Sequence, residues 1–187
     1  MPILPAEPEI YPANLWEEYP GPGEDRRWFC LHTRPRQEKA AARDLLARRL
    51  TFYLPQVVRE GRTPAGRKIA SVLPLFGGYL FLFGDESQRL RALKGNRIVN
   101  VIEIADQDAL ALELRQIHRM MHSGLAIQPE PNAPVGGRVR ISSGPLAGLE
   151  GTVIRRGKRD HFVAVINMLG LGAAVALEDW QVQVLDT

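Results

Sequence analysis

The sequence has 187 residues, of which 45% are hydrophobic and 24% charged, a composition typical of soluble globular domains. Its longest apolar runs, such as Leu80–Phe83, are far too short to span a bilayer. The first residues also lack the basic start and apolar core that are typical of a secretory signal. The single cysteine, Cys30, excludes an internal disulfide and fits a reducing compartment, so we expect a soluble, cytoplasmic protein.

Residues 1–25 are predicted to form a proline-rich tail. Six prolines interrupt any regular element in this segment, and acidic residues alternate with them. Trp16 and Tyr19 could still dock on a folded surface, so complete disorder does not follow.

A strand and a helix are predicted after the tail. The apolar-aromatic run Trp28–Thr33 is typical of a strand, Pro35 stands where a helix can begin, and Gln37–Leu50 contains good helix formers. Between Arg26 and Lys68 the sequence carries 12 Lys and Arg but only three acidic residues, whereas the whole chain has a net charge of only +3. This local excess suits phosphate groups, although a solvated arginine-rich helix would carry the same pattern.

The next residues predict a hairpin followed by further strands and helices. In chain order, the pattern predicts a strand at Phe52–Pro55, hairpin arms at Gln56–Arg59 and Arg67–Leu73, a strand at Leu75–Phe83, a helix at Glu86–Lys94, a strand at Arg97–Ile104, and a helix between the N-cap Asp106 and Gly124. In this last helix, four apolar residues recur at the spacing of one buried face: Leu110, Leu114, Ile117 and Met121.

The rest of the chain is predicted to be a linker and a small β-domain. Five short strands are predicted within about fifty residues, at 138–141, 152–156, 162–166, 173–177 and 182–185. We therefore expect an α+β protein with a tail (1–25), a first domain (26–124), a proline-rich linker (125–134) and a five-stranded barrel (135–187).

No pattern in the sequence predicts catalysis. His118 and His122 have the i,i+4 spacing of two metal ligands, but no third ligand follows at a fitting distance. Cys30 is most simply a buried small apolar residue, and phosphate-cradling and dinucleotide-binding glycine motifs are absent from the sequence. We expect no enzymatic activity, no cofactor and no metal.

Together these segments resemble the NusG family of transcription elongation factors. Arg27–Lys39 is similar to the family's opening strand and helix, Leu75–Phe81 to its Phe-Pro-Gly-Tyr segment, and Gly144–Val153 to its KOW motif. The resemblance implies an NGN-type α/β sandwich, with an antiparallel sheet flanked by helices, and an SH3-like KOW barrel. It also implies a monomer that binds the RNA polymerase clamp region, modulates pausing, termination or antitermination, and recruits a further partner through the barrel.

The resemblance assigns three groups of binding residues. The expected polymerase contacts are His32, Phe76, Tyr79 and Phe81, although core packing is the better interpretation of Phe81. The expected contacts with non-template or upstream DNA are Arg34, Arg36 and Arg43. The expected contacts of the barrel with a small-subunit ribosomal protein or with Rho are Leu149, Met168, Leu169 and Leu171.

Departures from the family pattern suggest a specialised, RfaH-like paralogue. Gly77 replaces the family's proline, while Leu146, Leu149 and Leu169 stand where family members often carry phenylalanine. In the RfaH-type branch the barrel can refold as helices, but β-branched residues such as Val163 and Val175 favour strands here. The alternative function is that of a ribosome-associated or RNA-binding KOW protein.

Overall fold

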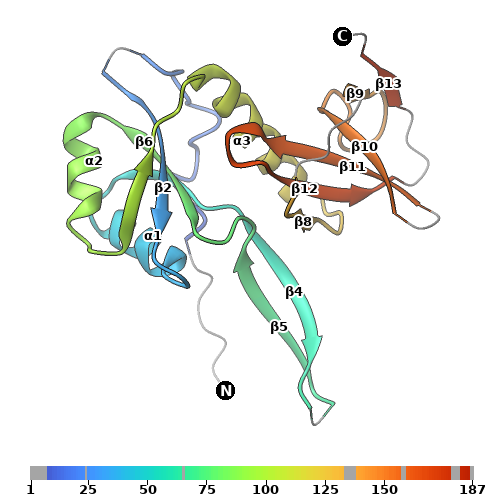
Figure 1. Ribbon diagram of the computed structural model, residues 1–187, viewed down its shortest axis with the longest axis horizontal. Coiled ribbons are helices and arrows are strands. Elements are labelled where there is room, and N and C mark those ends of the chain that lie inside the picture. The colour runs from blue at the N-terminus through green and yellow to red at the C-terminus, as the bar shows by residue number, and fades with distance from the viewer. Residues whose placement is uncertain are drawn as a thin grey trace. The chain divides into compact units, whose positions relative to one another are not determined.

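The computed structural model describes residues 8–23, 25–64, 66–132, 138–156, 159–177 and 182–185. It divides into two compact units, residues 1–108 (unit 1) and 109–187 (unit 2). Helices α1 (Glu38–Ala47) and α2 (Glu86–Leu93) connect strands of one antiparallel sheet, and α3 (Gln107–Met121) precedes a second antiparallel sheet (Figure 1), which confirms the predicted α+β class. No helix in the described part of the chain is long and apolar enough to cross a membrane.

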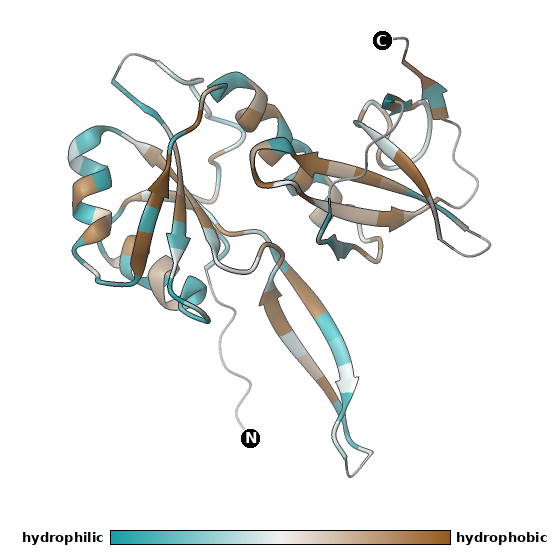
Figure 2. Ribbon diagram, in the orientation of Figure 1, coloured by the Kyte–Doolittle hydropathy of each residue, from teal (hydrophilic) through white to brown (hydrophobic). Residues whose placement is uncertain are grey.

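Unit 1 is built on a five-stranded antiparallel sheet in the order β1-β3-β6-β2-β7. Its strands are β1 (Ile10–Tyr11), β2 (Arg27–Thr33), β3 (Thr51–Tyr53), β6 (Tyr79–Gly84) and β7 (Ile98–Ile102). The two central strands bury apolar runs, Trp28–Leu31 in β2 and Leu80–Phe83 in β6, and Figure 2 shows β6 largely in brown.

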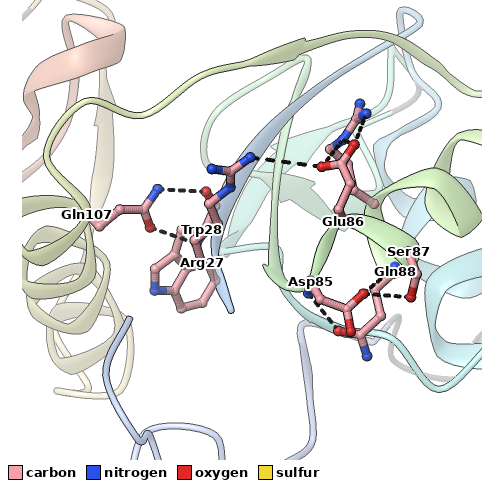
Figure 3. Close-up of polar contacts among 8 residues, drawn as sticks. Arg27, Trp28, Asp85, Glu86, Ser87, Gln88 and Gln107 are labelled. Atoms are coloured by element: carbon pink, nitrogen blue, oxygen red, sulfur yellow. Dashed lines mark hydrogen bonds and ion pairs between the residues drawn. The ribbon is translucent and has the colours of Figure 1, made fainter. Parts of the chain in front are cut away.

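Two helices pack on this sheet. Helix α1 (Glu38–Ala47) buries Ala41, Ala42 and Leu45 in the core, while Leu46 is exposed. Helix α2 (Glu86–Leu93) begins at a capping box, in which Asp85 Oδ1 accepts from the Gln88 N–H at 2.8 Å and Gln88 Oε1 accepts from the Asp85 N–H at 3.0 Å (Figure 3).

The expectation that prolines exclude regular structure from the N-terminal tail is wrong for residues 10–11. This short strand pairs with β3, and the Leu54 N–H donates to the Glu9 carbonyl at 2.6 Å. Leu15 is buried, and the rings of Trp16 and Tyr19 pack against Trp28, whose indole Nε1 donates to the Tyr19 hydroxyl at 2.8 Å. The described part of the tail therefore belongs to the fold of unit 1.

The predicted hairpin is present as a separate two-stranded sheet formed by β4 (Gln56–Arg62) and β5 (Lys68–Pro74). We call it the β4–β5 ribbon. Val57 anchors its base in the core, and the Lys39 ammonium donates to the carbonyl of Val72.

Helix α3 (Gln107–Met121) starts at the end of unit 1. The Gln107 side chain fixes this start, because its amide accepts from the Trp28 N–H at 2.7 Å and donates to the Trp28 carbonyl at 3.0 Å (Figure 3). The predicted apolar face of the helix is confirmed for Leu110, Leu114 and Ile117, but Met120 rather than Met121 is its last fully buried residue.

Unit 2 contains most of α3 and a six-stranded antiparallel sheet in the order β13-β9-β10-β11-β12-β8. The strands are β8 (Gln128–Glu130), β9 (Arg138–Ile141), β10 (Glu150–Arg156), β11 (Arg159–Ile166), β12 (Leu171–Ala176) and β13 (Val182–Val184). All five predicted strands are present. The sixth, β8, lies in the predicted linker, so that segment contributes an edge strand to the sheet.

Glycines allow the strands of unit 2 to approach closely. A Cβ atom at Gly151 would lie 2.3 Å from the Val163 carbonyl oxygen, and one at Gly172 would lie 2.6 Å from the Ala164 carbonyl oxygen. Neither contact is possible for a real side chain, so both positions require glycine for packing.

Candidate functional site

An aromatic cluster on unit 1 contains all four residues predicted to bind polymerase. His32 on β2 and Tyr79 on β6 are directly paired, and their rings stack with centroids 5.3 Å apart. Phe76 and Phe81 meet edge to face with centroids 6.5 Å apart. Only His32 and Tyr79 are partly exposed, since Phe76 and Phe81 are buried in the core. The accessible part of the cluster is therefore the His32–Tyr79 stack, whereas the two phenylalanines belong to the core.

A turn formed by Gly77 and Gly78 positions this stack. Gly78 has a φ of +87°, and an added Cβ would lie 3.5 Å from the His32 ring. The buried carboxylate of Glu38 accepts from the Gly78 N–H at 2.7 Å, and the Gly78 carbonyl accepts from the Thr33 N–H at 2.8 Å. The turn is thus held by both the first helix and the second strand.

The three arginines predicted to contact DNA are exposed at the junction of β2 and α1. Arg34 and Arg36 lie in the connecting loop, and Arg36 adopts a φ of +61°. Arg34 donates to the Asn96 side-chain oxygen at 3.1 Å, which joins the loop to the turn after α2. Arg43 follows on the exposed side of α1.

Further cations that the sequence interpretation missed lie where α1 and α2 end. The Arg48 guanidinium donates to the Arg91 carbonyl at 2.7 Å, and the Arg91 guanidinium donates to the Arg48 carbonyl at 2.8 Å. Each arginine thereby satisfies a carbonyl at the end of the other helix, where cations also interact well with the helix dipole. Exposed Arg49 and Lys94 flank the pair. In the sequence, these cations could have been inferred from the Arg48-Arg49 dipeptide, which lies at the end of a predicted helix.

The loop predicted to bind the barrel's partner is a short 3₁₀ turn, η1 (Asn167–Leu169), ended by Gly170 at a φ of +63°. Met168 is exposed, whereas Leu169 and Leu171 are half-buried. Leu149 is only 1% exposed and packs in the interior of unit 2. In this conformation it supports the fold and is not part of an accessible docking surface.

Side-chain hydrogen bonds join α3 to the β-domain within unit 2. Glu113 accepts from the Asn167 N–H at 3.2 Å, Gln116 accepts from the Glu150 N–H at 2.7 Å, and Arg119 donates to the Ala147 carbonyl at 3.0 Å. A groove of about 720 Å³ runs between the same segments. The η1 loop is therefore held in place by α3.

Cys30 and the His118–His122 pair, the titratable groups considered in the sequence, lie in surroundings that shift their pKa values. Cys30 is fully buried, and burial raises the pKa of its thiol to about 12. The rings of His118 and His122 lie next to each other on α3, tilted by 39° with centroids 4.1 Å apart. Burial, and to a lesser extent the charge of His122, lowers the pKa of His118 to about 4. At neutral pH the thiol is protonated and His118 is uncharged.

Comparisons with known proteins give one family. The model of the NusG family, described as transcription termination factor nusG, matches residues 26–121. Among solved structures, the chain is similar to one described as "Domain interaction in Thermotoga maritima NusG", with 18% identity and a TM-score of 0.47 over 82% of this chain and 93% of that chain. No curated protein matches the sequence.

Proposed function

This chain belongs to the NusG family, a family of non-enzymatic transcription factors, and from this premise we propose that it binds RNA polymerase through the His32–Tyr79 stack. The family match supports a role in transcription elongation or termination in general. The finer proposal is that binding at the clamp region shifts the polymerase between conformations and thereby modulates pausing, termination or antitermination. Such a shift requires only a difference in affinity for the two conformations.

One observation carries this proposal: two aromatic side chains are stacked and partly exposed next to a turn that is hydrogen-bonded to α1 and β2. Aromatic anchors held in one conformation contribute much to protein interfaces because little entropy is lost when they bind. His32 and Tyr79 fit that description, since each ring is held by the other and the His32 ring lies against Gly78.

Contact with non-template or upstream DNA is the second part of the proposal. Arg34, Arg36 and Arg43 would bind phosphates, and the reciprocal Arg48–Arg91 pair extends their basic surface. Phosphate contacts of this kind position a protein without reading sequence.

Recruitment of a further partner, either a small-subunit ribosomal protein or Rho, is assigned to unit 2. The exposed Met168 and the half-buried Leu169 and Leu171 would form the docking patch. Leucine in place of phenylalanine at Leu146, Leu149 and Leu169 supports a specialised, RfaH-like paralogue.

For the domain boundaries, we propose an NGN-like domain at 26–124 and a KOW domain at 135–187.

The experiment is a pull-down of core RNA polymerase with the full chain, followed by titration. We expect Tyr79→Ala to weaken binding about tenfold or more, as truncation of an aromatic anchor does. Phe76 is unsuitable as a test because its truncation would empty part of the core. Leu90→Ala is the matched control, since Leu90 is a half-exposed apolar residue on α2 in the same unit.

Two results would contradict the proposal. Equal binding by wild type and a folded Tyr79→Ala variant would exclude the His32–Tyr79 stack as the contact. Capture of ribosomes or RNA without polymerase would instead favour the alternative, a ribosome-associated or RNA-binding KOW protein.

A further inference from the structure

The β4–β5 ribbon has no role in the function proposed above. It forms its own sheet with seven residues in each strand, and each arm is roughly 24 Å long at about 3.4 Å per residue. Between residues 58 and 73 every described residue is exposed except the half-buried Thr63. Figure 1 shows β4 and β5 extending away from the five-stranded sheet of unit 1. An isolated hairpin gains little stability from its own packing, so the core does not explain this length.

The far end of the ribbon is basic and its charges are not neutralised internally. Arg59, Arg62, Arg67 and Lys68 stand against a single acidic residue, Glu60. The register places Arg62 directly opposite Lys68, an arrangement in which like charges repel. Among the described residues, no ion pair joins any of these four cations to a carboxylate. An external anion would relieve this repulsion.

The shape of the ribbon selects the kind of anion. The major groove of B-form DNA is about 12 Å wide and admits a two-stranded β-ribbon, whereas the major groove of A-form RNA is too deep and narrow. Proteins bind single strands mainly by stacking bases on aromatic side chains, and residues 56–74 include no aromatic residue.

We propose that the β4–β5 ribbon inserts into the major groove of duplex DNA, where Arg62, Arg67 and Lys68 contact the phosphates. The ribbon is attached to the rest of unit 1 at its base, through the buried Val57 and the hydrogen bond from Lys39 to the Val72 carbonyl. Because the rest of the ribbon is exposed, it can reach a duplex without rearrangement of the core. The proposal concerns DNA alone and does not depend on binding to polymerase.

The test measures binding of the full chain to a fluorescently labelled 20-base-pair duplex by anisotropy, across a range of salt concentrations. The ribbon variant is Arg62→Ala with Lys68→Ala. A swap, Arg62→Lys with Lys68→Arg, keeps the charge, while Arg26→Ala with Arg115→Ala removes two exposed cations elsewhere. The same substitutions are also made in an Arg34→Ala, Arg36→Ala, Arg43→Ala background, which removes the first basic surface.

If the ribbon contacts two phosphates through Arg62 and Lys68, the slope of log K against log salt falls by about 2 in the ribbon variant. We expect this loss in both backgrounds, with the swap binding like wild type. An unchanged slope in the ribbon variant would overturn the proposal, as would an equal loss in the Arg26/Arg115 control. Equal losses on single-stranded DNA or duplex RNA of the same length would overturn insertion into the major groove.

Discussion

At the residue scale, the two adjacent glycines of the Gly77-Gly78 turn have different requirements. Gly78 has a positive φ, which costs an L-residue about 1–2 kcal/mol, although its surroundings leave room for a methyl group. Gly77 has no positive φ, and a Cβ there would meet no atom within 4 Å.

We therefore predict that Gly78→Ala lowers the free energy of unfolding by about 1–2 kcal/mol, whereas Gly77→Ala is neutral or raises it by about 0.5 kcal/mol. Urea unfolding of both variants checks this. Equal effects at the two positions would contradict the backbone conformation assigned to Gly78.

Cys30 makes a second prediction at this scale. Because burial raises the pKa of its thiol to about 12 from an ordinary 9.0, the neutral thiol is the form compatible with the fold. The associated stability is complete below pH 9 and is lost as the pH rises from 9 toward 12. At pH 8 we expect a thiol-specific reagent to label native protein about 100-fold or more slowly than urea-unfolded protein. Cys30→Ser gives the background, and rapid native labelling would contradict the burial.

Residue-level burial was only partly predictable from the sequence. The two-residue period places Tyr79 and Phe81 on one side of β6, yet Tyr79 is partly exposed beside His32, whereas Phe81 is buried and meets the Phe76 ring. Leu149 was assigned to a partner surface from its motif position, but its side chain lies in the interior of unit 2. Local sequence reports periodicity, whereas burial depends on which distant segment packs against each position.

At the scale of elements, the first residue of α3 has a specific task. The Gln107 amide pairs with both backbone groups of Trp28, which a side chain of another shape could not satisfy (Figure 3). Without that amide, a partly buried N–H and carbonyl would be left unpaired. We predict that Gln107→Ala lowers the free energy of unfolding by about 1–3 kcal/mol.

The matched control is Asp108→Ala, an exposed change in the same helical turn, which should alter stability by no more than about 0.5 kcal/mol. Chemical unfolding followed by tryptophan fluorescence measures both variants. If the two substitutions had the same effect, the Gln107–Trp28 pairing would not hold the start of α3.

Elements with strong periodicity or clear caps were predicted well. The helix predicted at Glu86–Lys94, the apolar β2 strand and the two hairpin arms all coincide with observed elements. The short strands β1 and β8 were missed because proline-rich segments carry little intrinsic preference for a strand. Both form at sheet edges, where a partner strand supplies the hydrogen bonds and a proline without an N–H is tolerated.

At the scale of the whole molecule, the family match and the folded unit do not begin at the same residue. The family model starts at residue 26, but unit 1 includes an aromatic layer contributed by residues before it. Trp16 stacks on Trp28 with centroids 5.6 Å apart and meets Tyr53 edge to face at 5.5 Å, while Tyr19 packs on Phe83 at 5.1 Å. Such aromatic pairs contribute beyond the area they bury.

The N-terminal segment should therefore stabilise unit 1 even though it lies outside the matched region. We predict that Trp16→Ala lowers the free energy of unfolding by about 2–3 kcal/mol, somewhat less than for a fully buried tryptophan, and lowers the melting temperature by several degrees. Glu17→Ala, at the exposed position that follows Trp16 in the same segment, should change stability by less than about 0.5 kcal/mol. Differential scanning calorimetry of the full chain distinguishes the two cases. Indistinguishable melting of the Trp16 and Glu17 variants would mean that the segment is only attached to unit 1. A selective loss for Trp16→Ala would mean that the fold of this protein needs residues beyond those the family model matches.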